Sequence, residues 1–241
     1  MSFPVSGRQT QVVLGVDGCR AGWVGVVLTP DPPVLSVLGA TIGALVDAGA
    51  AAAGAAGPLA AIGIDMPIHP PEIGPRPADV AARAHLGRKA SSIFLTPARS
   101  VLGATTYAEA CEVARSIDGR GISRQAWALR GKILEVGAWL DSAPCPVYEI
   151  HPEVSFSVLS GTPIIPSKKT AEGLAARWCA LESAGIVVPP GLEDAPGVAR
   201  DDVLDAAVVA WSARRIAAGL ARSFPDPPER LGDGRVAAIW A

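Results

Sequence analysis

Carboxylate side chains interrupt the apolar pattern of this chain at four places. Asp17 ends the apolar run VVLGVD, and Asp65 ends the run LAAIGID. Glu149 lies within VYEI, and Asp202 and Asp205 lie within RDDVLDAAVVAW. Carboxylates that converge without cationic partners repel one another, and Mg²⁺ or Mn²⁺ removes this repulsion because hard cations prefer oxygen ligands. A pair of such ions about 3.5–4 Å apart positions the attacking and leaving oxygens in phosphodiester hydrolysis.

Turns and helix caps offer a structural explanation for several of these acids. Asp17 followed by Gly18 fits an Asx turn, and Asp65 fits the turn that ends a strand. At the start of the last long helix, Asp201 suits the N-cap position and Asp202 interacts favourably with the helix dipole.

Two acids are not explained in this way. Asp205 lies three residues after Asp202 and so shares its helix face, but capping does not require it. Glu149 lies among Val, Tyr and Ile, where a carboxylate is costly unless it is paired or bound to metal. A solvent-facing position on an edge strand is the alternative for Glu149. Together the acids favour a divalent-metal site.

The elements that would position these acids follow from apolar runs, caps and turn residues. The first three strands are close enough in sequence to form an antiparallel meander. Ser167 is the expected N-cap of the helix that follows it. In chain order the expected strands are 12–17, 23–28, 34–38, 59–64, 146–150 and 235–241, and the expected helices are 42–53, 77–86, 106–117, 123–141, 167–185 and 200–224.

This order of elements predicts an α/β fold in a single domain over residues 1–241. The sheet is expected to be mixed, with the antiparallel three-strand meander joined to parallel strands, flanked by helices and carrying a helical insertion at 77–141. Sites form at the edge where strands end in such sheets, and a helix packed on the sheet can bring two more carboxylates to that edge.

Five motifs, in this order along the chain, resemble an uncharacterised family described as predicted nucleases of the ribonuclease-H fold. They are GVDGCRAGW, IGIDMPI, GRKASSIF, YEIHPEVSF and DDVLDAAVVAW, and the resemblance covers about residues 12–240. More distantly, the chain is similar to RuvC-type Holliday-junction resolvases, which also have a strand ending in Asp, an inner strand ending in an acid, and a last helix that opens D-x-x-D-A.

The resemblance implies a ribonuclease-H-like fold and a metal-dependent nuclease. On this basis Asp17, Asp65, Asp202 and Asp205 would bind two Mg²⁺ or Mn²⁺ ions, and Glu149 would lie beside them as a further catalytic residue. Asp65 departs from the Glu that is usual in the resolvases, so its shorter side chain requires the strand to lie closer to the metals. Whether the chain forms a homodimer, as the resolvases do, is left open.

Several other residues are candidates for substrate binding. Gly18, which has no side chain, would let substrate or metal approach the backbone. The GRKASSIF motif either binds phosphate or forms a solvated basic turn. His151 follows Glu149 by two residues and is either a metal ligand or proton shuttle, or the residue that begins a helix before Pro152. The candidates in the GRKASSIF motif are Arg88, Lys89, Ser91 and Ser92.

Composition limits the partners and the compartment. The formal net charge of −2 excludes a strongly basic surface and argues mildly against tight non-specific binding of DNA or RNA. Four cysteines without a CxxC pair argue against a zinc knuckle and suit a reducing cytosol.

The start MSFPVSGRQTQ lacks the apolar run of a signal peptide, and no apolar run reaches the roughly 18–20 residues of a membrane span. A cytoplasmic location without membrane contact is therefore expected. Lys168 and Lys169 either contact phosphate or form an ordinary exposed pair.

Three functions compete. The first is a metal-dependent nuclease that hydrolyses DNA or RNA by a metal-activated water. The second is a sugar-kinase or actin-like phosphotransferase or nucleotide binder, since those proteins also begin with a strand, an Asp and a Gly turn; they normally need two such domains and a second Gly-rich motif. The third is a non-catalytic binding module on the same fold. A structure in which the carboxylates of Asp17 and Asp205 lie more than about 8 Å apart would contradict the metal site.

Overall fold

A five-stranded mixed sheet forms the centre of the fold. The computed structural model describes residues 11–241, so residues 1–10 of the predicted single domain lie outside the described residues. The sheet order is β3-β2-β1-β4-β5; β1, β2 and β3 form an antiparallel meander, and β4 and β5 run parallel to β1. This arrangement confirms the predicted mixed, ribonuclease-H-like α/β fold. The strands are β1 Val12–Cys19, β2 Gly22–Leu28, β3 Leu35–Gly39, β4 Leu59–Ile64 and β5 Val147–Glu149.

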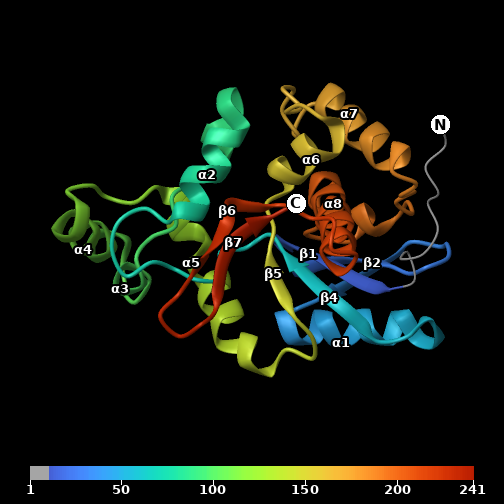
Figure 1. Cartoon of the computed structure of the whole chain (residues 1–241), viewed down its shortest axis with the longest axis horizontal. Helices are drawn as coiled ribbons and strands as arrows, with labels where there is room; N and C mark the ends of the chain where they lie inside the picture. The colour runs from blue at the N-terminus through green and yellow to red at the C-terminus, as the bar shows by residue number, and fades with distance from the viewer. Residues whose placement is uncertain (1–10) are drawn as a thin grey trace.

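Helices cover both faces of this sheet. Figure 1 shows α1 on one side of the sheet and α8 on the other, with α6 and α7 beyond α8. Helices α2 to α5 lie between β4 and β5 in the chain, where the sequence predicted a helical insertion; the division into one domain with an insertion stays a prediction. The helices are α1 Ile42–Ala53, α2 Pro77–Leu86, α3 Arg99–Leu102, α4 Tyr107–Asp118, α5 Arg124–Trp139, α6 Pro152–Ser160, α7 Ala171–Ser183 and α8 Arg200–Ala217.

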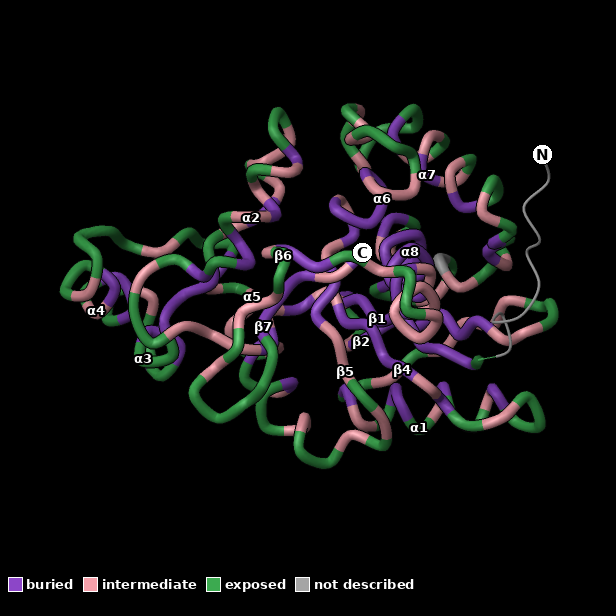
Figure 2. Tube along the Cα trace, in the orientation of Figure 1, coloured by how far each residue is buried: buried purple, intermediate pink, exposed green. Residues whose placement is uncertain are grey.

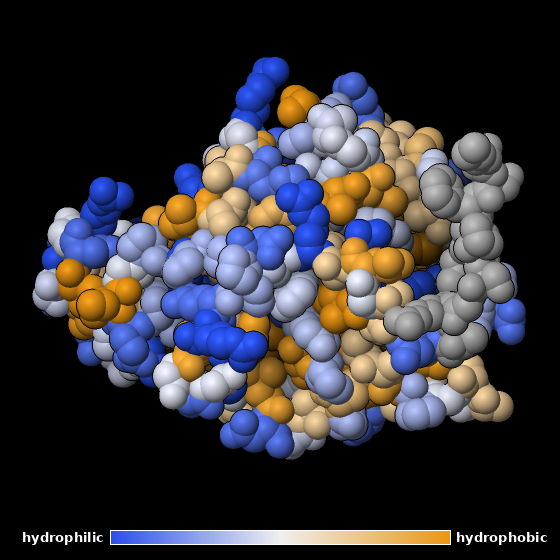
Figure 3. Space-filling view, viewed as in Figure 1, coloured by the Kyte–Doolittle hydropathy of each residue, from blue (hydrophilic) through white to orange (hydrophobic). Residues whose placement is uncertain are grey.

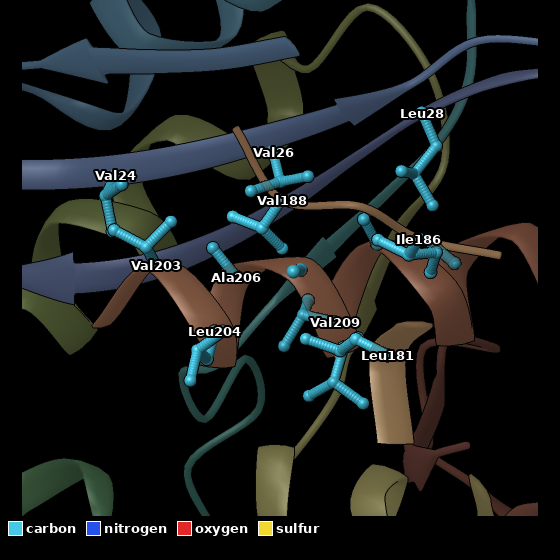
Figure 4. Packing of buried hydrophobic residues seen from close by; sticks show 14 of the residues in the cluster. Val24, Val26, Leu28, Leu181, Ile186, Val188, Val203, Leu204, Ala206 and Val209 are labelled. Atoms are coloured by element: carbon cyan, nitrogen blue, oxygen red, sulfur yellow. The ribbon is translucent and has the colours of Figure 1, made fainter. Parts of the chain in front are cut away.

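Successive side chains of each strand point to opposite faces of the sheet, so the core has two layers. Leu14 and Val16 of β1 belong to the buried cluster on the α1 side, whereas Val13 belongs to the cluster that contains α8. Figure 2 shows the buried segments concentrated in β1, β2, β4 and α8. Figure 4 shows Val203 and Ala206 of α8 in the same packed cluster as Val24 and Val26 of β2. Because both faces are covered, the central strands are continuous apolar runs.

Two glycines allow α8 to lie directly on the sheet. A Cβ at Gly15 would be 2.6 Å from the Cα of Ala210, and a Cβ at Gly63 would be 2.9 Å from Cγ1 of Val209. Each glycine lies two residues before an acid, Asp17 or Asp65, and therefore on the same face of its strand. The two glycines therefore let α8 approach the sheet on the same face that carries Asp17 and Asp65.

The expected helix over 200–224 is wrong at its end. Helix α8 ends at Ala217, and Gly219, with φ of 69°, directs the chain away while the Leu220 N–H bonds the Arg215 carbonyl. The chain then forms β6 Ser223–Arg230, which pairs with β7 Val236–Trp240 in a separate antiparallel hairpin. The sequence predicted β7 but not β6, because three prolines in SFPDPPER remove ladder donors.

The segment before α8 also differs from expectation. The expected helix over 167–185 begins at Ala171, because Thr170 rather than Ser167 caps it and accepts the Gly173 N–H at 3.1 Å. Residues 167–170 instead form a turn. Helix α6 was absent from the expected order of elements, but its start at Pro152 agrees with the interpretation of His151 as the residue that begins a helix.

On the face drawn in Figure 3, hydrophobic side chains occur in small groups among hydrophilic ones, and hydrophilic side chains gather over the turn of the β6–β7 hairpin. Within residues 11–241, none of the helices combines the length and apolar character that crossing a bilayer requires.

Candidate metal centre

Asp17 and Asp65 are brought together by the parallel register of β1 and β4. Val16 is paired with Ile64, and the Asp65 N–H donates to the Val16 carbonyl at 2.9 Å, which places the two acids at the same level. Asp65 directly follows β4, as predicted. Asp17 does not end its strand, because β1 continues to Cys19, so the expected end at residue 17 is wrong. Both acids lie on the face of the sheet covered by α8.

Asp205 completes a cluster of three carboxylates. It lies on α8 one turn before the helix passes over Gly15, and its side chain is only 1 % exposed. One carboxylate oxygen from each of Asp17, Asp65 and Asp205 lies within 4.8 Å of the others. This distance is well inside the limit set from the sequence. These three residues can therefore hold a metal ion, as the sequence predicted for them.

Burial of the three acids raises their pKa values. Burial raises the pKa of Asp17 well above its usual range, and the charges of Asp65 and Asp205 raise it further. Burial raises the pKa of Asp65 to about 7 and that of Asp205 to about 6, in both cases against the opposing charge of Lys168. Bringing three carboxylates together in a buried place is unfavourable without a cation, and the raised pKa values express this cost.

Lys168 is the cationic partner that the sequence interpretation missed. Its ammonium forms an ion pair with Asp205 and lies 3.7 Å from Asp201. The interpretation of the two lysines as an ordinary exposed pair is therefore wrong: Lys168 is 35 % exposed, whereas Lys169 is 66 % exposed and pairs only with Asp201, at 2.6 Å, in the contacts seen among the described residues. Burial alone would lower the pKa of Lys168, but the charges of Asp205 and Asp17 raise it.

Asp202, a predicted metal ligand, has a different role in this structure. Its Oδ2 accepts the N–H of Ala199 at 3.0 Å, and Ala199 is the N-cap of α8, so the expectation that Asp201 caps the helix is wrong. Asp202 is half-buried, and burial raises its pKa. Within the described residues, the cluster of potential ligands contains Asp205 but not Asp202. The role of Asp202 as a ligand stays a prediction.

Glu149 lines the same pocket as the three acids but has its own hydrogen-bond partners. It is paired with Ile64, whose side chain lies in the α1 layer, so alternation directs Glu149 to that face. Arg76 binds Glu149 with two hydrogen bonds, from Nη1 at 2.8 Å and Nη2 at 2.6 Å, and the Ile68 N–H donates at 2.9 Å. The buried carboxylate thus has the partner that it needs, and the partner is an arginine. The catalytic role predicted for Glu149 stays untested.

Arg76 also binds a second buried acid. Its guanidinium contacts Asp79 of α2, and the other oxygen of Asp79 accepts the Thr96 N–H at 2.8 Å. The pairing of Arg76 with Glu149 was not predictable, because Glu149 lies 73 residues away in the chain.

His151 begins α6, in agreement with one of its two interpretations. Its Nδ1 accepts the Glu153 N–H at 3.2 Å, and burial lowers its pKa, which favours the neutral imidazole. Glu153 in turn binds Arg177 at 2.7 Å and lies 3.5 Å from Lys89. His151 and Glu153 line the same pocket as the three acids.

The other residues predicted to bind substrate are divided between the pocket and the surface. Gly18 lines the pocket, and a Cβ there would be 2.9 Å from Cδ of Lys132, so the stem of Lys132 lies beside it; the role of Gly18 in substrate binding stays a prediction. The GRKASSIF motif forms a 3₁₀ helix, Gly87–Ser92. Ser92 lines the pocket and Lys89 faces Glu153, while Arg88 and Ser91 are exposed.

The pocket around the acids has a volume of about 280 Å³. A second pocket of about 550 Å³ shares part of its wall, at Ile93, Phe94, Thr96 and Gln125. The two pockets are therefore neighbours, and the second is lined partly by α2 and by the segment that joins α4 to α5.

The comparisons with known proteins add a family and no function. A family model described as a protein of unknown function, DUF429, matches residues 15–230. None of the curated proteins matches the chain. No solved structure matches it either.

Proposed function

We propose that this chain, which belongs to the DUF429 family, is a divalent-metal-dependent nuclease that hydrolyses phosphodiester bonds. The observation that carries this proposal is the convergence of Asp17, Asp65 and Asp205, whose carboxylate oxygens lie within 4.8 Å of one another. Opposite oxygens around one Mg²⁺ ion are about 4 Å apart, so a single hard cation can contact all three carboxylates after small side-chain adjustments.

The charges of the pocket support a divalent ion. Three carboxylates and the ammonium of Lys168 leave a formal charge of −2 when all four are ionised. The neighbouring acids already have cationic partners: Glu149 has Arg76, and Glu153 has Arg177. Arg76 is shared between Glu149 and Asp79, so the largest unbalanced negative charge lies in the three-acid cluster, where a divalent ion would balance it.

The donor set favours Mg²⁺ or Mn²⁺. All three ligands are carboxylates, and hard cations prefer such oxygen donors, whereas softer metals favour Cys and His. When bound, an ion of this kind polarises water and neutralises charge on a phosphate. Hydrolysis forms a bond from the water oxygen to phosphorus and breaks the bond to the leaving oxygen, while one proton leaves the water and one reaches the leaving group. Lys168 can donate a hydrogen bond to a phosphate oxygen during this exchange.

Two neighbouring pockets suit an extended substrate such as DNA or RNA. The larger pocket shares part of its wall with the pocket of the acids and is lined by Arg83 and Arg120. A polynucleotide could place one phosphate at the acids and its neighbours along this second pocket. Because the net charge of the chain is −2, recognition would depend on such local contacts rather than on a generally basic surface.

Cleavage assays test this proposal. Purified protein is incubated with branched DNA, single-stranded DNA and an RNA–DNA hybrid, with Mn²⁺, with Mg²⁺ and with a chelator. We expect metal-dependent cleavage of at least one substrate and its loss in Asp205→Asn, while Asp47→Asn, an exposed change on α1, keeps full activity. Cleavage that persists in the chelator or in Asp205→Asn would refute the proposal. Thermal stabilisation of the protein by ATP, without cleavage of any nucleic acid, would favour the phosphotransferase.

A further inference from the structure

We infer that Lys168 is a built-in second cation of the acid cluster, so that the site takes one divalent ion where the sequence predicted two. This inference rests on the proposed function, because it concerns the metal that the three carboxylates would hold. It is carried by the position of the Lys168 ammonium, by the turn that holds it and by the engagement of Asp202.

The ammonium of Lys168 lies where it can replace an ion. It forms an ion pair with Asp205, is 3.7 Å from Asp201, and interacts electrostatically with Asp17 and Asp65. Paired ions in two-metal sites lie about 3.5–4 Å apart and share carboxylate ligands. An ammonium bound to one oxygen of Asp205 leaves the other oxygen of that carboxylate for a single ion shared with Asp17 and Asp65.

The turn that carries Lys168 is held by several contacts. Thr170 caps α7, and its hydroxyl also donates to the Ser167 carbonyl at 2.8 Å. A Cβ at Gly173 would clash with that same carbonyl, so α7 packs tightly on the turn. The fully buried Arg177 donates to the Pro166 carbonyl at 3.2 Å and the Gly173 carbonyl at 2.9 Å. Lys168 is therefore presented to the acids by a fixed backbone.

The predicted fourth ligand is engaged elsewhere. A second ion would draw on Asp202, whose carboxylate accepts the Ala199 N–H at the start of α8. Releasing Asp202 would leave that N–H without its partner and would weaken the helix start. With Lys168 in place, a second ion would thus have to compete both with the ammonium and with the helix start for its ligands.

Charge balance leads to the same result. Three carboxylates are neutralised by one divalent ion together with the Lys168 ammonium. Two divalent ions beside Lys168 would leave two excess positive charges in a buried place, which is strongly unfavourable before an anionic substrate arrives. A lysine ammonium also has three donors, so Lys168 can bind the cluster and a phosphate oxygen at once.

Counting bound Mn²⁺ tests the inference without any nuclease assay. The number of ions per chain is measured by isothermal titration calorimetry and by electron paramagnetic resonance of free Mn²⁺, for wild type, Lys168→Met, Lys168→Arg and Lys169→Met. Thermal unfolding of each variant confirms that it is folded. We expect one ion in the wild type, in Lys168→Arg and in Lys169→Met, and two ions, close enough to show spin coupling, in Lys168→Met.

The possible failures are distinguishable. Two ions in the wild type, or a single ion in a folded Lys168→Met variant, would overturn the role of Lys168 and leave the nuclease proposal standing. Absence of Mn²⁺ binding in all four proteins would overturn the metal site itself. A third outcome is one ion in the wild type and two in Lys168→Met, without cleavage of any nucleic acid. It would support the role of Lys168 as a second cation and count against the nuclease proposal.

Discussion

The backbone of Ala210 in α8 lies against Gly15 in β1, so closely that a Cβ at Gly15 would be 2.6 Å from the Ala210 Cα. This contact sets how near α8 comes to the sheet. Asp17 lies two residues further along β1, and Asp205 lies on the adjoining turn of α8. The separation of these two carboxylates therefore depends on Gly15, which has no side chain that could bind metal or substrate.

Gly15→Ala is expected to destabilise the protein by about 3 kcal/mol, because the added methyl group meets backbone atoms that cannot rotate away. It should also weaken Mn²⁺ binding, since α8 must move and carry Asp205 away from Asp17. Urea unfolding and Mn²⁺ titration measure the two effects. The control is Gly131→Ala in the exposed interior of α5, where a Cβ has nothing within 4 Å; it should gain about 0.5–1 kcal/mol. Equal stabilities for the two variants would contradict this account of α8.

Asp17→Asn should abolish stabilisation by metal. Wild-type protein in Mn²⁺ at about one hundred times its Kd should gain about 2.7 kcal/mol of unfolding free energy. The variant should gain almost nothing, and without metal it should be at least as stable as the wild type, because one of three mutually repelling carboxylates is neutral. Thermal unfolding with and without Mn²⁺ measures this, with Asp47→Asn as the matched control. A full Mn²⁺ effect in Asp17→Asn would exclude Asp17 as a ligand.

The raised pKa values predict a pH-dependent stability difference between wild type and Asp65→Asn. In the folded protein the pKa of Asp65 is about 7, above its unfolded value near 3.9, so the folded state retains a proton that the unfolded state has lost. The stability contributed by this group is therefore lost as the pH rises from about 4 to about 7.

Without metal, the unfolding free energy of the wild type minus that of Asp65→Asn should fall between about pH 4 and pH 7. Both proteins share the three histidines, so histidine titration largely cancels in this difference. Urea unfolding across this range measures it. A difference that rises with pH would mean that the environment of Asp65 is cationic rather than acidic.

Arg76→Met is expected to cost about 3–5 kcal/mol, because Glu149 and Asp79 would remain buried without their cation. The control is Arg99→Gln, which breaks an ion pair with Glu72 whose side chains are 59 % and 78 % exposed and should cost at most about 1 kcal/mol. Urea unfolding compares the two. Similar costs for both variants would show that Arg76 does not stabilise the pocket wall.

The three clustered acids were predictable because strand pattern and helix spacing are local signals. Apolar runs marked β1 and β4, and the D-x-x-D spacing marked one face of α8. Two finer features depended on geometry that the sequence does not display. Glu149 lies one residue out of phase with Asp65 in the parallel register, which sends it to the other face, and Asp202 is close enough to the helix start to bind the Ala199 N–H.

Lys168 could not be assigned from the sequence, because its contact with Asp205 depends on how the turn before α7 packs on α8. Its neighbour Lys169 has the same residue type and nearly the same surroundings in sequence, yet it extends into solvent. Strand β6 was missed for a different reason, since its three prolines are typical of loops and its pairing with β7 is irregular between Phe224 and Glu229.

Anomalous diffraction from crystals soaked in Mn²⁺ tests the metal centre most directly. We predict one anomalous peak with carboxylate oxygens of Asp17, Asp65 and Asp205 about 2.0–2.6 Å away, and with Lys168 still in contact with Asp205. A map without a peak among these three carboxylates, at a Mn²⁺ concentration that produces peaks elsewhere in the crystal, would contradict the account.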